Sequence, residues 1–177
     1  MTGVLIERAA LIAQTAHQAV GQKRKYIGDE YFIHPRMVAR IISFYDATSE
    51  MIAAAFLHDV LEDTQVTEEF LREQVGNAVT NLVIEVTDVS KPSDGNRRLR
   101  KAKDRDHLAK ASPEAQTIKL ADTLDNISSI VHYDPKFAKV YIREKVDLLE
   151  VMNRGNPQLY MTTAKIIKSH AEELFRS

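Results

Sequence analysis

Residues 53–64 read Ala-Ala-Ala-Phe-Leu-His-Asp-Val-Leu-Glu-Asp-Thr, and this segment decides the fold and the chemistry that we expect. An almost continuous apolar run ends at His58 and Asp59, and Glu62 and Asp63 follow within one further turn. In a helix, residues three or four apart lie on the same face. Glu62 is four residues from His58 and three from Asp59, so the spacing predicts that these three side chains share one sector. Asp63 is expected at the flank of that sector.

Three carboxylates at the end of a largely apolar helix are energetically costly. A buried carboxylate without a partner costs several kcal/mol, and the negative end of the helix dipole adds roughly 0.3–1 kcal/mol for each acid. A divalent cation would offset both terms, because its charge dominates the local electrostatics. The alternative is that the acids are solvated and that His58 is a hydrogen-bonded surface residue. The spacing behind an apolar helix favours the metal site.

Two other segments offer further metal ligands. His34 precedes Pro35 at a predicted helix start, after an aromatic and apolar stretch. Asp122 interrupts an apolar helical run, and Asn126 lies one turn later on the same face. Each residue also has a simpler interpretation, since His34 can hydrogen-bond at a helix start and Asp122 can pair with Lys119.

The composition excludes several classes of protein. A chain of 177 residues can form one domain with its own core. Charged residues make up 28% and the formal net charge is −1, which argues against general nucleic-acid binding. The absence of cysteine excludes disulfides and thiolate chemistry. Because the sequence has neither a signal peptide nor the roughly 20-residue apolar stretch that a membrane span needs, we expect a soluble, cytoplasmic protein that binds neither nucleic acid nor membrane.

Helical periodicity dominates the chain, so we expect an all-α fold with a single domain over residues 1–177. We expect a helix ending before Gly21, one from Pro35 to about Tyr45, one capped by Thr48 or Ser49, and one starting at Thr67 that Gly76 divides from the next. The basic run Arg97 to Lys103 is expected to lead into another helix, followed by one starting at Ser112 and by two closing helices separated near residues 155–157. Residues 88–96 are expected to form a loop, and residues 82–87 are the one run that could also be a strand.

Taken together, these residues closely resemble the HD-domain phosphohydrolases. Within that family the chain looks like the hydrolase domain of RelA/SpoT-type alarmone enzymes, specifically the stand-alone small alarmone hydrolases. The matching motifs are Arg24-Lys25, Tyr31-x-x-His34-Pro35-x-x-Val38-Ala39, residues 54–64, Val83-x-x-Val86-Thr87, and Ile118 to Asp122 followed by Asn126. They run in order from about Leu5 to Leu149. A His-Asp pair alone is common, but His-Asp-x-x-Glu-Asp between His-Pro and Lys-Leu-Ala-Asp is specific.

The resemblance implies a helical bundle of about eight to ten helices with one Mn²⁺ per chain. The implied metal ligands are His34, His58, Asp59 and Asp122. Fe²⁺ or Zn²⁺ also suits a site of two imidazoles and two carboxylates. The implied reaction removes pyrophosphate from the ribose 3′ position of guanosine tetraphosphate or pentaphosphate (ppGpp or pppGpp) and gives GDP or GTP. Glu62 and Asp63 would activate or orient the attacking water.

The resemblance also implies contacts to a nucleotide substrate. The substrate-binding residues that we predict are Arg24, Lys25, Asn126, Arg97, Arg98 and Tyr141. Guanidinium groups suit bidentate phosphate binding, although a solvated helix face explains Arg97 and Arg98 equally well. The chain departs from the family pattern at Ala19, where a His often stands and where His17 is displaced instead, and at Glu30, where a Pro is common. Beyond Asn126 the match thins, which leaves the base and the phosphate pattern open.

The leading interpretation is therefore a stand-alone alarmone hydrolase that only degrades its substrate. Two alternatives stay open. The same metal site could act on another phosphorylated nucleotide, such as an adenosine alarmone or a phosphorylated cofactor. The chain could instead be a non-catalytic nucleotide-binding or antitoxin-like module, although binding alone would not require both Glu62 and Asp63. The sequence is compatible with a homo-oligomer and does not settle the oligomeric state or the existence of a partner synthetase.

Overall fold

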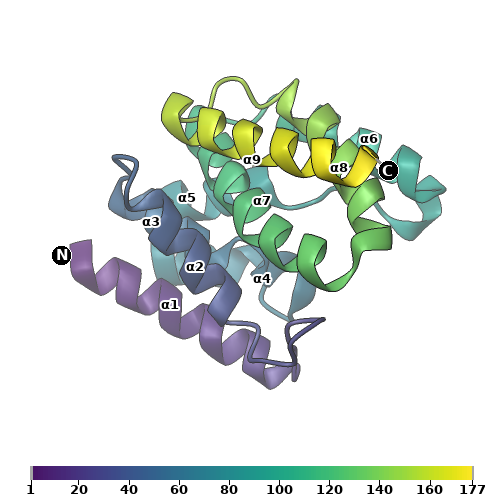
Figure 1. Cartoon of the computed structure of the whole chain (residues 1–177). Helices are drawn as coiled ribbons and strands as arrows, with labels where there is room; N and C mark the ends of the chain where they lie inside the picture. The colour runs from purple at the N-terminus through teal and green to yellow at the C-terminus, as the bar shows by residue number, and fades with distance from the viewer. Residues whose placement is uncertain (1, 177) are drawn as a thin grey trace. The chain divides into compact units, whose positions relative to one another are not determined.

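Figure 1 shows the computed structural model, which describes residues 2–176. Within that range the chain forms nine α-helices and one 3-10 helix, and its extended pairing is limited to an isolated bridge between Lys23 and Glu30. The predicted all-α fold class is therefore confirmed. The chain divides into two compact units, one up to Thr87 and one from Asp88, and each is described by itself.

The first unit is built around a short, largely buried helix, α3 (Ser49–Leu57). Its helices are α1 (Thr2–Ala19), α2 (Ile33–Ile42), α3 (Ser49–Leu57), α4 (Val60–Asp63) and α5 (Glu68–Val86). Helix α3 packs against α1, α2 and α5, and its small residues permit this close approach. Ala53, Ala54 and Ala55 have no exposed surface. The hydroxyl of Thr48 caps α3 by accepting a hydrogen bond from the Met51 N–H at 3.2 Å, as expected for a Thr at this position.

Helix α5 is interrupted at Gly76, as predicted, and it includes most of the run 82–87 that could also have been a strand. The Thr67 hydroxyl caps its start by accepting from Phe70 N–H, and Gly76 interrupts it with φ 82° and ψ 170°. A positive φ of this kind is easily adopted only by glycine. Residues 82–86 are helical, because buried Val79, Val83 and Val86 follow a three- to four-residue period.

The segment around His58 corrects one expectation. A single helix was expected to carry His58, Asp59, Glu62 and Asp63 on its buried end, but α3 ends at Leu57 and α4 begins only at Val60. Asp59 lies between them with φ −102° and ψ −5°. Glu62 and Asp63 are exposed residues in the first turn of α4, so the predicted dipole penalty does not apply to them and neither carboxylate is enclosed in the core. Helix α2 likewise starts at Ile33, two residues before the expected position, and ends at Ile42.

The second unit is organised by a long buried helix. It contains the 3-10 helix η1 (Pro92–Asp94) and helices α6 (Arg97–Leu108), α7 (Pro113–Tyr133), α8 (Pro135–Leu149) and α9 (Pro157–Phe175). Helix α7 packs against both α8 and α9. Each of α7, α8 and α9 begins with proline, whose fixed φ suits the first helical position. The loop expected over residues 88–96 is present, apart from η1.

Buried Gln116 of α7 fixes the connection between α8 and α9. Its side-chain nitrogen donates to the Leu108 carbonyl at 3.0 Å, and its side-chain oxygen accepts from the Arg154 N–H at 3.0 Å. At Gly155 an added Cβ would lie 2.9 Å from Leu120 Cδ1 and 3.2 Å from the Thr117 backbone nitrogen. The backbone at Gly155 therefore has no room for a side chain.

None of the described helices is both long and apolar enough to cross a bilayer.

Candidate metal centre

The first unit brings three of the four predicted ligands together. His34 lies in the first turn of α2, and His58 and Asp59 form the junction between α3 and α4. The two Nε2 atoms of His34 and His58 are 3.2 Å apart, and the Asp59 Oδ2 lies 3.0 Å from His58 Nε2 and 3.6 Å from His34 Nε2. One ligand atom from each residue lies within 4.8 Å of the others. Both imidazoles are 1% exposed.

The hydrogen bonds around the cluster orient its ligand atoms inward. The Ala55 carbonyl lies 2.9 Å from His58 Nδ1 and can only accept, so the imidazole proton resides on Nδ1. The lone pair of His58 Nε2 therefore faces His34 and Asp59. The Tyr31 hydroxyl donates to Asp59 Oδ2 at 2.5 Å, and the Tyr31 ring contacts the edge of His34 with 5.7 Å between ring centroids. Such supporting contacts are typical of residues that hold metal ligands in place.

The donor set fits a divalent metal ion. Without a cation between them, the lone pairs of the two imidazole nitrogens and the carboxylate oxygen would repel one another. The carboxylate charge would also be partly removed from water at a cost in free energy. A first-row divalent ion accepts this mixture of nitrogen and oxygen ligands. The His and Asp cluster therefore indicates a divalent metal, whose identity the ligand chemistry alone leaves among Mn²⁺, Fe²⁺ and Zn²⁺.

The two predicted catalytic acids lie outside this cluster, on α4. Asp63 Oδ2 accepts a hydrogen bond from the side-chain nitrogen of Gln22 at 2.8 Å. Loss of hydration around the carboxyl raises the pKa of Asp63, the negative charge of Asp59 adds to the rise, and the hydrogen bond from Gln22 opposes both. Gln22 and His17 were not predicted as site residues, and only the displacement of His17 from the family pattern drew attention to this segment.

Asp122 belongs to the second unit, where it makes the ion pair with Lys119 that the sequence suggested and is also hydrogen-bonded to Asn126. It is 5% exposed in α7. Its Oδ2 lies 3.1 Å from Lys119 Nζ, and its Oδ1 accepts from Asn126 Nδ2 at 2.6 Å. An ion pair with Lys119 and a metal-ligand role are compatible, because a carboxylate accepts several bonds. The roles of Asp122 as a metal ligand and of Asn126 as a substrate contact stay predictions.

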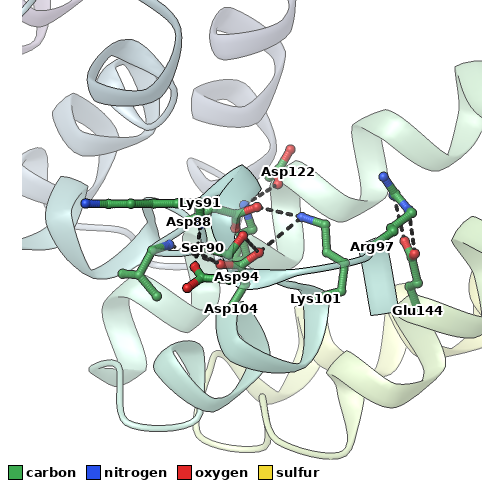
Figure 2. A network of polar contacts seen from close by, with 11 residues as sticks. Asp88, Ser90, Lys91, Asp94, Arg97, Lys101, Asp104, Asp122 and Glu144 are labelled. Atoms are coloured by element: carbon green, nitrogen blue, oxygen red, sulfur yellow. Dashed lines mark hydrogen bonds and ion pairs between the residues drawn. The ribbon is translucent and has the colours of Figure 1, made fainter. Parts of the chain in front are cut away.

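Figure 2 shows the polar network next to this helix, in which Asp104 organises the segment after α5. Asp104 accepts hydrogen bonds from Val89 N–H at 3.1 Å and from Ser90 N–H at 2.8 Å. Lys101 Nζ donates to Asp88 Oδ2 at 2.6 Å and lies 3.5 Å from Asp104. Burial alone would raise the pKa of Asp88, but the ammonium groups of Lys119, Lys101 and Lys145 outweigh it and lower that pKa. This network holds α6 beside the start of the second unit.

Two of the predicted substrate contacts of the second unit, Arg97 and Arg98, line a cavity of about 700 Å³. Arg97 lines it, but its guanidinium makes a bidentate pair with Glu144 at 2.7 and 2.9 Å. Arg98 is exposed and also lines the cavity. Tyr141 is 8% exposed, with Lys145 Nζ 4.8 Å from its ring centroid. The cavity has an excess of cationic side chains, which suits an anionic ligand.

Arg24 and Lys25 lie in the first unit, in the loop after α1. Arg24 exchanges backbone hydrogen bonds within this loop, donating to the Asp29 carbonyl at 2.8 Å and accepting from Gly28 N–H at 2.9 Å. Lys25 is exposed and lies 5.1 Å from the Tyr26 ring centroid. The loop is thus held by its own backbone, and the substrate contacts assigned to both residues stay predictions.

Lys145 should titrate unusually early for a lysine. Burial, followed by the nearby charge of Lys119, lowers the pKa of Lys145 from 10.5 to about 8. Between the folded-state pKa of about 8 and the ordinary value of 10.5, Lys145 is protonated in the unfolded chain but largely deprotonated in the folded chain. The free energy of unfolding should therefore rise with pH over this range, by at most about 3 kcal/mol. Urea unfolding at pH 7.5 and 10 should show this rise in the wild type and in a control, Lys168→Met at an exposed position. Lys145→Met should lack it; an equal rise in that variant would contradict the prediction.

Comparison with known proteins identifies the family. A family model described as "HD domain" matches residues 9–149, which is most of the chain. The chain is a helical protein whose His and Asp cluster indicates a divalent metal. It belongs to the HD-domain family.

Several relatives of known sequence contain a related segment. A probable guanosine-3′,5′-bis(diphosphate) 3′-pyrophosphohydrolase of Mycoplasma pneumoniae is 34% identical over 137 residues, covering 72% of this chain and 19% of the relative. A GTP pyrophosphokinase of Streptomyces coelicolor is 34% identical over 144 residues, covering 81% of this chain and 17% of the relative. The chain thus spans about a fifth of the length of the curated relatives that it matches.

A solved structure matches over nearly the whole length of both chains. It is described as a metazoan ortholog of SpoT that hydrolyses ppGpp and plays a role in starvation responses. It is 27% identical to this chain, with a TM-score of 0.78, and the match covers 97% of this chain and 94% of that one. The helical fold of this chain is therefore similar to that of a solved protein chain of nearly the same length.

Proposed function

We propose that this chain removes pyrophosphate from the ribose 3′ position of ppGpp or pppGpp, with one Mn²⁺ as its metal. The observation that carries the proposal is the buried cluster of His34, His58 and Asp59 in a chain of the HD-domain family. Relatives named for this reaction, and a solved structure described as hydrolysing ppGpp, support the choice of substrate. We also propose that residues 1–177 form one HD-type domain, because the family match includes parts of both units.

The residues would divide the reaction as follows. His34, His58 and Asp59 would hold the metal, with Asp122 as the fourth ligand. When bound, such an ion supplies charge that stabilises phosphate oxygens and makes a coordinated water more acidic. Asp63, assisted by Glu62, accepts a proton from the attacking water. Water oxygen bonds to the phosphorus attached to the ribose 3′ oxygen, the bond from that phosphorus to the 3′ oxygen breaks, and the 3′ oxygen takes up a proton.

The remaining predicted residues would bind the nucleotide. The substrate-binding residues in this proposal are Arg24, Lys25, Asn126, Arg97, Arg98 and Tyr141. Arg97 would have to exchange its bidentate pair with Glu144 for a phosphate, whereas exposed Arg98 needs no such exchange. We therefore expect Arg98 to contribute more to phosphate binding than Arg97 does. The excess positive charge of the second-unit cavity supports an anionic substrate.

The experiment that tests this proposal is a comparison of substrates and metals. Purified protein is loaded in turn with Mn²⁺, Fe²⁺ or Zn²⁺ and assayed with ppGpp, pppGpp, the adenosine counterpart and phosphorylated nicotinamide cofactors. Pyrophosphate and orthophosphate are measured separately. Pyrophosphate release that is fastest with ppGpp or pppGpp and Mn²⁺ is the expected result. Orthophosphate release from a cofactor would assign another substrate, and no release from any compound by metal-loaded protein would favour the non-catalytic module.

A further inference from the structure

We propose that Gln22 and His17 are positioning residues that hold the Asp63 carboxylate in the orientation needed to activate water. The inference rests on the function proposed above and adds to it two residues outside the predicted site. Gln22 is half-buried and joins the two other residues directly. Its side-chain nitrogen donates to Asp63 Oδ2 at 2.8 Å, and its side-chain oxygen lies 2.5 Å from His17 Nδ1.

The direction of this hydrogen-bond chain follows from the chemistry of its members. An ionised carboxylate only accepts hydrogen bonds, so the amide nitrogen of Gln22 must face Asp63 and its oxygen must face His17. Burial lowers the pKa of His17, which leaves the imidazole neutral with a single N–H. Because the Gln22 oxygen only accepts, that N–H lies on Nδ1. The Gln22 side chain therefore has one defined orientation, with its donor end toward the carboxylate.

The end of α1 fixes this arrangement through the backbone. Gly21 has φ 65°, its N–H donates to the Gln18 carbonyl at 2.9 Å, and the Gln22 N–H donates to the His17 carbonyl at 3.0 Å. This pair of bonds around a left-handed glycine is the Schellman arrangement that closes a helix. It returns the chain over the last turn, so Gln22 contacts His17 through both its backbone and its side chain. The side chain that is hydrogen-bonded to Asp63 is thus held at the closed end of α1.

The same imidazole lies behind a metal ligand as well. The His17 ring centroid is 4.7 Å from that of Tyr31, whose hydroxyl donates to Asp59 Oδ2. His17 is 1% exposed, so its position is set by packing. His17 therefore contacts both Tyr31, which is bonded to the predicted metal ligand Asp59, and Gln22, which is bonded to the predicted proton acceptor Asp63. This shared support would keep the two carboxylates in a constant relation.

The test uses variants that remove the hydrogen bonds but keep the volume. Gln22→Met should lower kcat for pyrophosphate release about 10- to 100-fold, the usual effect of losing a residue that orients a functional group, with KM, metal content and Tm unchanged. His17→Leu should lower kcat similarly, and His17→Asn should restore most of it, because the Asn amide can donate from nearly the same place as Nδ1. Gln18→Met, the same change at an exposed position four residues away, should leave kcat unchanged.

Other outcomes would overturn the inference. Wild-type kcat in Gln22→Met, or a loss of kcat that parallels a loss of Tm or of metal, would show that Gln22 does not act through Asp63. If the wild type hydrolyses no nucleotide, the proposed function fails, and the contact is then judged by NMR. The side-chain amide proton of Gln22 that is donated to Asp63 should be slow to exchange in the wild type and should lose that protection in Asp63→Ala. Equal exchange in both proteins would overturn the inference without any activity measurement.

Discussion

The Asp59→Ala variant is expected to lose its metal and, with it, all measurable release of pyrophosphate. Asp59 supplies the carboxylate of the cluster in the first unit, and its removal leaves two imidazoles as the ligands there. Changes to residues that merely orient metal ligands cost about 10- to 100-fold in affinity, so loss of a ligand itself should cost more than about 100-fold. The Tyr31 hydroxyl would also lose its acceptor. Metal content after dialysis, followed by the pyrophosphate assay with ppGpp, measures both effects.

A matched control separates this effect from a general change of charge. Glu73→Ala removes one exposed carboxylate from α5 of the same unit and should leave metal content and activity at wild-type values. Circular dichroism should show both variants to be helical, because Asp59 lies at the junction of α3 and α4 and contributes no core side chain. Stoichiometric metal in Asp59→Ala would show that Asp59 is not a ligand. Full activity after metal removal would contradict metal dependence itself.

The fold could be predicted from the sequence wherever a local rule decided it. Thr48 and Thr67 cap helices as expected, Gly76 breaks α5, and the helix starts at Pro113 and Pro157 agree with the prediction. Such signals depend on a few neighbouring residues and on their backbone preferences. The end of α3 was not predictable in this way, because no Gly or Pro marks it. Apolar periodicity continues through the junction, and the tertiary environment decides where the helix stops.

In the candidate site, too, the residues within a motif could be predicted, whereas those that contact it from distant parts of the sequence could not. Motif spacing identified His58 and Asp59 as candidates, and His34 joins them over a sequence separation of 24 residues from His58. The supporting residues were missed because their roles depend on contacts that spacing does not encode. Gln22 reaches Asp63 over a separation of 41 residues, and Tyr31 reaches Asp59 over 28. Exposure of Glu62 and Asp63 was also missed, because it follows from the unpredicted helix break. The roles of Asp122 and of the substrate contacts remain predictions.

The Asp63→Asn variant is expected to keep its metal and to lose nearly all turnover. The substitution preserves the size of the side chain and an oxygen that can accept from Gln22, but the amide has no appreciable basicity. A positioned proton acceptor contributes about 10²- to 10⁴-fold to the rate, so kcat should fall by this factor while the metal content stays at the wild-type value. Asp63 lies outside the His34, His58 and Asp59 cluster, which is why metal binding and turnover should separate here and fall together in Asp59→Ala.

Single-turnover release of pyrophosphate, measured with metal-loaded protein, gives the rate of the chemical step without the contribution of product release. Glu73→Gln makes the same chemical change at an exposed site in the same unit and should turn over at the wild-type rate. If Asp63→Asn kept its rate and Glu62→Gln lost it, the proton would go to Glu62, and Asp63 would only orient the water. If both variants kept their rates, water activation would not depend on α4. Loss of turnover in Asp63→Asn alone, with metal bound, would assign the proton-accepting role to the carboxylate that Gln22 holds.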